Sequence, residues 1–469
     1  MDETKRYIQS FLSQKKIDIS SRKAALFEEF ASNETNINAV KIIQENQKII
    51  MQNWILKNRI DDILTQTVLI PNGTVNKKYQ AKIDFAALGW NDIVFFEIKG
   101  LENSGLVFDL NDEILYGVPE ISGDLKLKAM FRIEGEAEDS VLNEKIITLI
   151  VNPDPKSLWK NLESDKNDPF WKADVATVSD KFLDKNIVIA SKRGRSHANA
   201  GSFREDDFAF KNFKEIGWSV VAVSDGAGSA SLSRQGSKLA CNSVIEYFEE
   251  NLNAAVFNEF DAVLAAHHQK ITEETSKKIS HFVYHNLSKA AYFAHQKIVE
   301  AALKNEADLK NFHATLIFAM VKKYDFGYAV LTFGIGDCPI GLLDKELTEI
   351  KLMNWLDVGD FGGGTRFITM PEIFQNDKFS SRFGFKLVDD FSYLMLMTDG
   401  IYDPKFVVEA SLEKIEKWNE FLNDLQGNNE DGIKLEFNKD NTEIAAQLSD
   451  WMDFWSPGNH DDRTLAIIY

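Results

Sequence analysis

Apolar residues recur at helical spacing near the start of the chain. Asn33 and Thr35 are candidate helix caps, and a stripe follows them at intervals close to 3.6 residues, formed by Ile37, Val40, Ile43, Ile50 and Trp54. A single stripe of this kind has to pack against a partner surface. Residues 1–65 are therefore predicted to be a helical accessory region that mediates dimerisation or docking.

Between residues 66 and 152 the pattern changes to short β-type runs, such as NDIVFFEIKG and DLKLKAMFRI, which turn residues separate. This pattern predicts a small β-sandwich. The residues Gly105-Leu106, Phe108-Asp109, Gly117, Pro119 and Gly123 resemble the GL-x-FD…GxP…G signature of Ig-like domains in bacterial proteins. The resemblance implies an Ig-like sandwich over 66–152 and carries little information about chemistry.

The second half of the chain alternates apolar strand runs with long helical stretches. Residues 153–180 contain three prolines, many charges and few apolar clusters, which predicts a linker. From 181 to 469, strand runs come in groups, and helices are predicted over about 232–250 and 258–307, with others within 405–450. Grouped strands with helices between them predict an α+β domain.

Composition and charge narrow the classes of partner. The chain is 44% hydrophobic and 27% charged, as in ordinary globular proteins. A net charge of −19 argues against binding to nucleic acid or to anionic membranes, but it is compatible with divalent cations, which carboxylates bind. Only two cysteines, no apolar run of about 20 residues and a charged N-terminus predict a cytoplasmic protein.

Acidic residues stand at the ends of several predicted strands. Three apolar runs end in Asp225-Gly226, Gly336-Asp337 and Asp399-Gly400, whereas Glu205-Asp206 and Asp461-Asp462 precede the runs FAF and RTLAIIY. One Asp-Gly is a common hairpin turn, but five clusters at strand ends can gather carboxylates at one place. Gathered carboxylates repel each other and need cations. Without a Cys/His pattern, they favour Mg²⁺ or Mn²⁺.

The order of these motifs resembles the PPM family of type 2C metal-dependent protein phosphatases, in its bacterial branch. The matching segments are SHANAGSFREDD, VAVSDGAGSA, ATLIFAMV, FGIGDCPIGLL, GGGTRFIT, MTDGIYD and HDDRTLAII. The resemblance implies an αββα sandwich of two antiparallel sheets flanked by helices. It also implies hydrolysis of phosphoserine and phosphothreonine in proteins by a water that two metal ions activate. A phosphorylated protein is the expected substrate, and a cognate Ser/Thr kinase system is the expected partner.

Residue roles follow from the same resemblance. The expected catalytic carboxylates are Asp225, Asp399 and Asp461. The expected ligands of the two Mg²⁺ or Mn²⁺ ions are Glu205, Asp225, the Gly226 carbonyl, Asp399 and Asp461, with Asp337 at a weaker third site. We expect Asp206, Asp403 and Asp462 to support these ligands.

Three positions depart from the family pattern, among them Asp462, which stands where asparagine is commoner. Gly201 stands where the phosphate-binding arginine is usual, so Arg195, His197 and Arg204 are all candidates for that role. Ala227 stands where many eukaryotic members have a histidine, so the leaving group must be protonated from elsewhere. These departures leave open a pseudophosphatase or phosphoprotein-binding regulatory module, and a metal-dependent phosphatase of small molecules.

Other candidate residues have plainer interpretations. His281 and His285 are four residues apart without an HExxH pattern, and Cys338 lacks the CxxxxxR loop of cysteine phosphatases, so we interpret all three as surface or packing residues. His460 adjoins Asp461 and is a candidate for contact with substrate or bound water. The Gly-rich segment 361–365 lacks the P-loop lysine and is predicted to be a flap near the site.

Overall fold

The computed structural model describes residues 3–251, 254–357 and 364–469. The chain divides into two compact units, residues 1–158 and residues 159–469. Among the described residues, none of the helices combines the length and the apolar character that crossing a membrane requires. Of the Gly-rich segment predicted to be a flap, residues 361–363 fall outside the described part of the chain.

The first unit begins with three helices, α1 (Glu3–Gln14), α2 (Ala24–Ser32) and α3 (Glu34–Thr65). Asn33 caps α3, because its side chain accepts a hydrogen bond from the Thr35 N–H at 3.0 Å. Farther along α3, several large apolar side chains are exposed: Ile42, Ile49, Ile50, Met51, Trp54 and Ile55. The predicted helical region is confirmed, whereas its role in dimerisation or docking stays a prediction.

Two small sheets complete the first unit. One has the order β1-β7-β6-β3, and the other has the order β2-β5-β4. Their strands are β1 (Gly73–Thr74), β2 (Tyr79–Lys82), β3 (Ile93–Lys99), β4 (Leu106–Asp109), β5 (Ile114–Gly117), β6 (Gly123–Ile133) and β7 (Asn143–Asn152), with the short helix α4 (Phe85–Leu88) between β2 and β3. Both sheets contribute to one apolar cluster, which includes Leu115 and Leu149. The small sheets are as predicted, and the Ig-like assignment stays a prediction.

The second unit contains two larger antiparallel sheets. The five-stranded sheet has the order β10 (Asp207–Phe213), β11 (Trp218–Ser224), β12 (Leu316–Tyr324), β13 (Gly327–Ile335) and β16 (Phe383–Val388). The six-stranded sheet has the order β15 (Ile350–Leu352), β14 (Ile340–Asp344), β17 (Phe391–Met397), β18 (Arg463–Ile468), β9 (Lys185–Lys192) and β8 (Val175–Phe182). Strand β8 begins at Val175, within the segment 153–180 that was predicted to be a linker, so the last residues of that segment are a strand instead.

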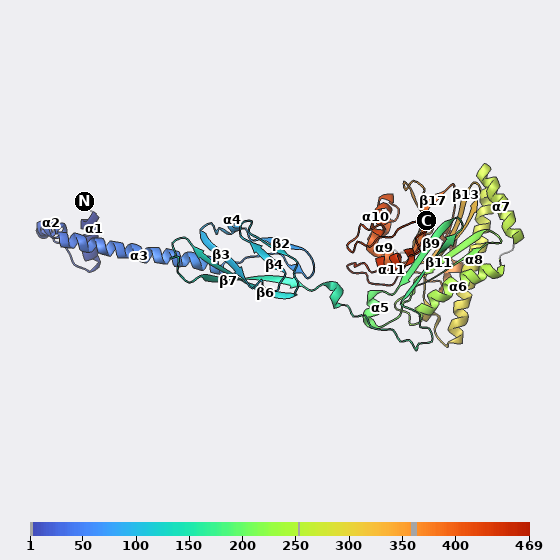
Figure 1. Cartoon of the computed structure of the whole chain (residues 1–469), viewed down its shortest axis with the longest axis horizontal. Helices are drawn as coiled ribbons and strands as arrows, with labels where there is room; N and C mark the ends of the chain where they lie inside the picture. The colour runs from blue at the N-terminus through green and yellow to red at the C-terminus, as the bar shows by residue number, and fades with distance from the viewer. Residues whose placement is uncertain (1–2, 252–253, 358–363) are drawn as a thin grey trace. The chain divides into compact units, whose positions relative to one another are not determined.

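The sheets form the two inner layers of this unit. Alternate residues of β11 explain the layering: Val221 and Val223 join a cluster with residues of the other sheet, whereas Val220 and Ala222 face a helical cluster. The five-stranded sheet is covered by α6 (Ser233–Asn251), α7 (Ala254–Gln269) and α8 (Glu273–Lys304) (Figure 1). The six-stranded sheet is covered by α9 (Asp399–Phe406), α10 (Ile415–Leu425) and α11 (Ile444–Trp451).

The predicted α+β class with antiparallel sheets is confirmed, with one difference in the helices. The helix predicted over 258–307 is two helices, because Thr272 starts a new one with a capping box that pairs it with Thr275. A further short helix, α5 (Arg195–Ala200), follows β9.

Candidate functional site

Acidic residues of both sheets lie where adjacent strands end. In the five-stranded sheet, Asp207 pairs with Ser224, so Glu205 and Asp206, which precede β10, stand beside Asp225, which follows β11. In the six-stranded sheet, Met397 pairs with Leu465, which brings the end of β17 beside the start of β18. The sequence thus places two acidic groups on neighbouring strand ends in each sheet.

Hydrogen bonds join the two groups across the sheets. Asp206, from the five-stranded sheet, accepts hydrogen bonds at Oδ2 from the Thr398 hydroxyl at 2.9 Å and the Thr464 hydroxyl at 2.8 Å. Thr398 immediately precedes Asp399, and Thr464 lies two residues after Asp462. The fully buried Asp206 therefore fixes the acidic end of one sheet against that of the other.

Four carboxylate oxygens at this rim are buried and have no hydrogen-bond partner among the described residues. They are Glu205 Oε2, Asp206 Oδ1, Asp337 Oδ1 and Asp399 Oδ1. A buried acceptor without a partner is costly, and oxygen-rich sites of this kind suit hard divalent cations. One oxygen each of Asp225 and Asp337 and the Cys338 sulfur also lie within 4.8 Å of one another. The donor set therefore fits Mg²⁺ or Mn²⁺.

Electrostatics supports the same interpretation. Burial, reinforced by the charge of Asp399, raises the pKa of Asp225 well above its usual range, and burial with the charge of Asp337 does the same for Asp399. Burial raises the pKa of Glu205 and of Asp206 to about 7. Carboxylates with such pKa values resist ionising together unless a cation offsets their charge.

Close backbone contacts require a glycine after Asp225 and after Asp399. The Asp225 N–H donates to the Thr315 hydroxyl at 2.9 Å, and the Thr315 N–H donates to the Asp225 carbonyl at 2.8 Å. A Cβ atom at Gly226 would lie 2.7 Å from the Glu205 carbonyl oxygen, and one at Gly400 would lie 1.9 Å from that of Asp462. Larger residues would clash there, which is why both motifs contain glycine.

His197 and Asp461 form an ion pair at the edge of the site. His197 Nδ1 donates to the Phe203 carbonyl at 2.7 Å, and Nε2 lies 3.1 Å from Asp461 Oδ1, so both ring nitrogens donate. Burial alone would lower the pKa of His197, but the hydrogen bond to Asp461 together with the charges of Asp462 and Glu205 raises that pKa to about 10. Burial opposes ionisation of Asp461, and His197 nevertheless holds its pKa below the usual value.

Asp462 has a structural reason to be a carboxylate where asparagine is commoner in the family. Its Oδ1 accepts the Gly194 N–H and its Oδ2 accepts the Glu205 N–H. An amide would offer only one acceptor oxygen to these two donors. Asp462 thus ties the segment before β10 to the start of α5. Asp403, the other expected supporting residue, is exposed, with Oδ2 3.5 Å from the Asn459 amide nitrogen.

The structure separates the candidates for phosphate binding. The buried Arg204 guanidinium donates to the Ala173 carbonyl, the Ser191 hydroxyl and the Asp206 carbonyl, at 2.9, 2.6 and 2.7 Å. Arg195 donates to the Asp453 carbonyl at 2.8 Å, and its Nε has no partner among the described residues. Gly201 has φ +71 as it ends α5, a conformation that side-chain-bearing residues rarely adopt.

Sequence reasoning missed two buried cations behind the acidic residues. Lys172 donates to the Asp206 carbonyl at 2.7 Å and lies 3.0 Å from Asp207 Oδ2. Arg382 binds both carboxylate oxygens of Asp357, whose Oδ2 accepts the Gly336 N–H at 2.9 Å, one residue before Asp337. Neither cation carries a motif that a single sequence reveals.

The residues given plainer interpretations lie as follows. The His281 and His285 rings stack at 5.7 Å, outside the clusters of potential metal ligands found among the described residues. The buried Cys338 has its sulfur 3.3 Å from the Thr315 hydroxyl. The His460 ring lies between Trp159 and Trp455, with centroids 4.6 Å from each.

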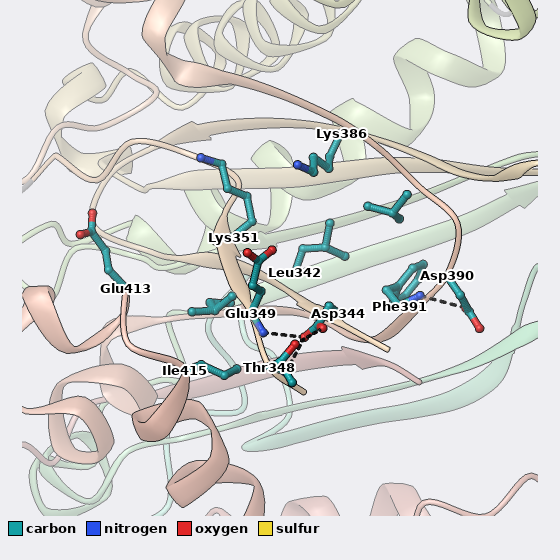
Figure 2. A pocket seen from close by; sticks show the side chains of 12 residues that line it. Leu342, Asp344, Thr348, Glu349, Lys351, Lys386, Asp390, Phe391, Glu413 and Ile415 are labelled. Carbon is teal, nitrogen blue, oxygen red and sulfur yellow. Dashed lines mark hydrogen bonds between the residues drawn. The ribbon is translucent and has the colours of Figure 1, made fainter. Parts of the chain in front are cut away.

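A separate pocket of about 360 Å³ lies away from the acidic rim (Figure 2). It is lined by Phe391, where β17 begins, whereas Asp399 follows the other end of that strand. Figure 2 shows Lys351, Lys386, Glu349 and Glu413 among the lining side chains, a mixed set of charges that does not favour an anion or a cation. This pocket is therefore not the candidate site.

Comparison with known proteins identifies the family. No curated protein matches the chain. Three similar solved structures are a bacterial serine phosphatase, the serine/threonine phosphatase Stp1 from Staphylococcus aureus, and the catalytic domain of the phosphatase PstP in complex with two manganese ions. The bacterial serine phosphatase is 12% identical and covers 60% of this chain and 96% of its own, with a TM-score of 0.35. Stp1 is 12% identical and covers 61% of this chain and 95% of its own, with a TM-score of 0.35. PstP is 15% identical and covers 60% of this chain and 96% of its own, with a TM-score of 0.34.

These structural likenesses are too distant to carry an argument. The family model described as protein phosphatase 2C, however, matches residues 193–453, which is more than half of the chain and spans the residues from α5 to just before Asp461. The chain belongs to the protein phosphatase 2C family.

Proposed function

We propose that the second unit hydrolyses phosphoserine and phosphothreonine in proteins, using two bound Mg²⁺ or Mn²⁺ ions. The observation that carries the proposal is the set of buried carboxylate oxygens without hydrogen-bond partners, at Glu205, Asp206, Asp337 and Asp399. When bound, the two ions supply an activated water and offset negative charge on the phosphoryl oxygens. Membership of the protein phosphatase 2C family supports the choice of substrate.

The chain's own residues have distinct roles in this proposal. Asp225, Asp399 and Asp461 hold the ions, with the Gly226 carbonyl and Glu205 as further ligands and Asp337 at a weaker third site. Asp206 joins the two sheets by accepting hydrogen bonds from the Thr398 and Thr464 hydroxyls. The Asp462 carboxylate keeps the Glu205 segment against Gly194.

Arg195 is the phosphate ligand we propose among the three candidates. The buried Arg204 uses Nε and Nη1 to bind protein oxygens, and His197 is bound to Phe203 and Asp461. Arg195 is only half-buried, and its guanidinium donates one hydrogen bond in the described structure, from Nη2 to the Asp453 carbonyl at 2.8 Å. Its place in α5, directly after Gly194, sets it next to the segment that Asp462 holds.

Phosphate release from a phosphoserine peptide tests the proposal. We expect activity with Mn²⁺ or Mg²⁺, none in excess EDTA, and a loss of more than about a thousandfold in kcat for Asp225→Ala and Asp399→Ala. Asp344→Asn, in the separate pocket, is the matched control and should retain activity. Full activity of the wild type in EDTA would overturn the metal-dependent mechanism.

The alternatives predict different outcomes of the same assay. A pseudophosphatase or phosphoprotein-binding module, which the departures at Gly201 and Ala227 motivate, would bind the phosphopeptide and release no phosphate with either metal. A phosphatase of small molecules would release phosphate from small esters while leaving phosphopeptides intact. A substrate panel that contains both classes separates these functions from the proposed one.

A further inference from the structure

The segment 159–174, which we call the strap, runs along the second unit before β8 begins. The Leu162 N–H donates to the Ala198 carbonyl of α5 at 2.9 Å. Arg193 donates to the Asn161 side chain and to the Leu162 carbonyl at 3.0 and 2.9 Å. Farther along, Asp168 forms an ion pair with Arg234 of α6 at 2.8 Å. The strap is therefore bound to elements on both sides of the acidic segment Glu205–Asp207.

Lys172 of the strap points its ammonium group at the back of that acidic segment. The side chain is 8% exposed. Its Nζ lies 2.7 Å from the Asp206 carbonyl, 3.3 Å from the Glu205 carbonyl and 3.0 Å from Asp207 Oδ2. The Arg234 carbonyl and the Ser237 hydroxyl, both on α6, lie at 3.2 and 3.4 Å. Five oxygens from two elements thus surround one buried cation.

These contacts fix the backbone direction of the acidic segment. Lys172 donates to the carbonyls of Glu205 and Asp206. The Ser237 hydroxyl also donates to the Glu205 carbonyl, and the Arg204 guanidinium also donates to the Asp206 carbonyl. Both peptide groups are thereby held by two donors each. The side-chain oxygens Glu205 Oε2 and Asp206 Oδ1 are the atoms left without a partner in the described structure.

We propose that Lys172 is a positioning residue for the metal centre, which holds the Glu205–Asp207 backbone so that the Glu205 and Asp206 side chains face the cations. The inference rests on the proposed function. Supporting residues that orient metal ligands typically change metal affinity or activity 10- to 100-fold when they are lost. Lys172 lies outside residues 193–453, the part of the chain that the family model covers.

Calorimetric titration of the full chain with Mn²⁺ tests this role without relying on activity. For Lys172→Met, which removes every donor, we expect the Mn²⁺ dissociation constant to rise about 10- to 100-fold. The kcat at saturating Mn²⁺ and the KM for phosphopeptide should stay within about threefold of wild type, because the ligands themselves are intact. Lys172→Gln keeps two N–H donors and should weaken binding less, by up to about tenfold.

Lys322→Met is the matched control. Lys322 is a partly buried lysine of the second unit, with its side chain 14% exposed, and it donates to the Ile216 carbonyl at 2.7 Å and to Asp261 at 2.6 Å. It lies near the end of β12 that is farther from Thr315. A merely structural role for Lys172 would lower the melting temperature in both variants and leave the Mn²⁺ affinity unchanged in both.

Four outcomes would overturn the inference. One is a folded Lys172→Met protein that binds Mn²⁺ as tightly as wild type. Another is an equal weakening by Lys322→Met. If Lys172→Met does not fold, wild-type affinity in Lys172→Gln overturns the inference by itself. A wild-type protein that binds no Mn²⁺ overturns the proposed metal centre, and the inference with it, whereas the other outcomes leave the proposed function standing.

Discussion

Replacing Asp225 with asparagine should stabilise the metal-free protein while removing its response to Mn²⁺. An oxygen of Asp225 lies within 4.8 Å of one of Asp337. At an effective dielectric constant of about 20, two unit charges at that separation repel by about 3 kcal/mol. Burial and neighbouring charges already raise the pKa of Asp225, so proton uptake relieves part of this repulsion. We therefore expect a gain of about 1–2 kcal/mol in the free energy of unfolding.

Scanning calorimetry of the full chain measures this effect, since it can resolve the transitions of the two units. At a Mn²⁺ concentration about 100 times the dissociation constant, binding should stabilise the wild type by about 2.7 kcal/mol relative to EDTA. In Asp225→Asn the same comparison should give less than about 1 kcal/mol, because the ion loses a ligand. The transition that responds to Mn²⁺ is that of the second unit.

Asp261→Asn provides a control with the opposite expected sign. Asp261 forms an ion pair with Lys322 at 2.6 Å and accepts the Tyr324 hydroxyl, so its charge is compensated. Neutralising it should destabilise the metal-free protein and leave the Mn²⁺ response intact. If Asp225→Asn lowers metal-free stability as Asp261→Asn does, or keeps the wild-type response to Mn²⁺, the reasoning about carboxylate repulsion is refuted.

Three other changes test separate parts of the molecule. Arg382→Met should cost about 3–5 kcal/mol in calorimetry, because the buried Asp357 loses its partner, and a loss below about 1 kcal/mol would contradict this. The Arg59 hydrogen bond outweighs burial and lowers the pKa of Asp92 below 3.8, so Asp92→Asn should destabilise the first unit at neutral pH. The stability difference from wild type should fade as the pH drops below 3.8 through the pKa of the folded state. A difference that stays constant down to about pH 2 would refute this. Arg195→Ala should raise the KM for phosphopeptide about tenfold at unchanged Mn²⁺ affinity; an unchanged KM would exclude phosphate binding.

The strands that carry the site could be predicted because both of their faces are buried. Strand β11 reads WSVVAVS, and all seven residues are buried, some against helices and the others against the second sheet. An uninterrupted apolar run is what such a strand requires. Each run then ends abruptly in Asp-Gly or Gly-Asp, where the chain reaches the rim. Asp225, Asp337 and Asp399 were visible for this reason.

Other features could not be predicted, since their partners lie far away in sequence. Lys172 stands 33 to 65 residues before the groups that it contacts, in a charged stretch that has the composition of a solvated linker. Asp357 and Arg382 look equally ordinary as separate charged residues, although they form a buried pair. The break before α8 depended on one cap at Thr272 within an otherwise helical pattern. Long-range pairing of polar groups leaves no periodic signal.

This difference bears on where the functional unit begins. The proposed acidic ligands stand in recognisable motifs because each follows or precedes a strand, where close backbone contacts require glycines such as Gly226 and Gly400. Groups that support those ligands have no such constraint and can come from any segment that reaches them. The family match begins at residue 193, after β8 and β9, although β9 pairs with β18 directly beside Asp462. With Lys172 added, the proposed metal centre includes residues from the strap onward, and the compact unit that contains all of them begins at Trp159.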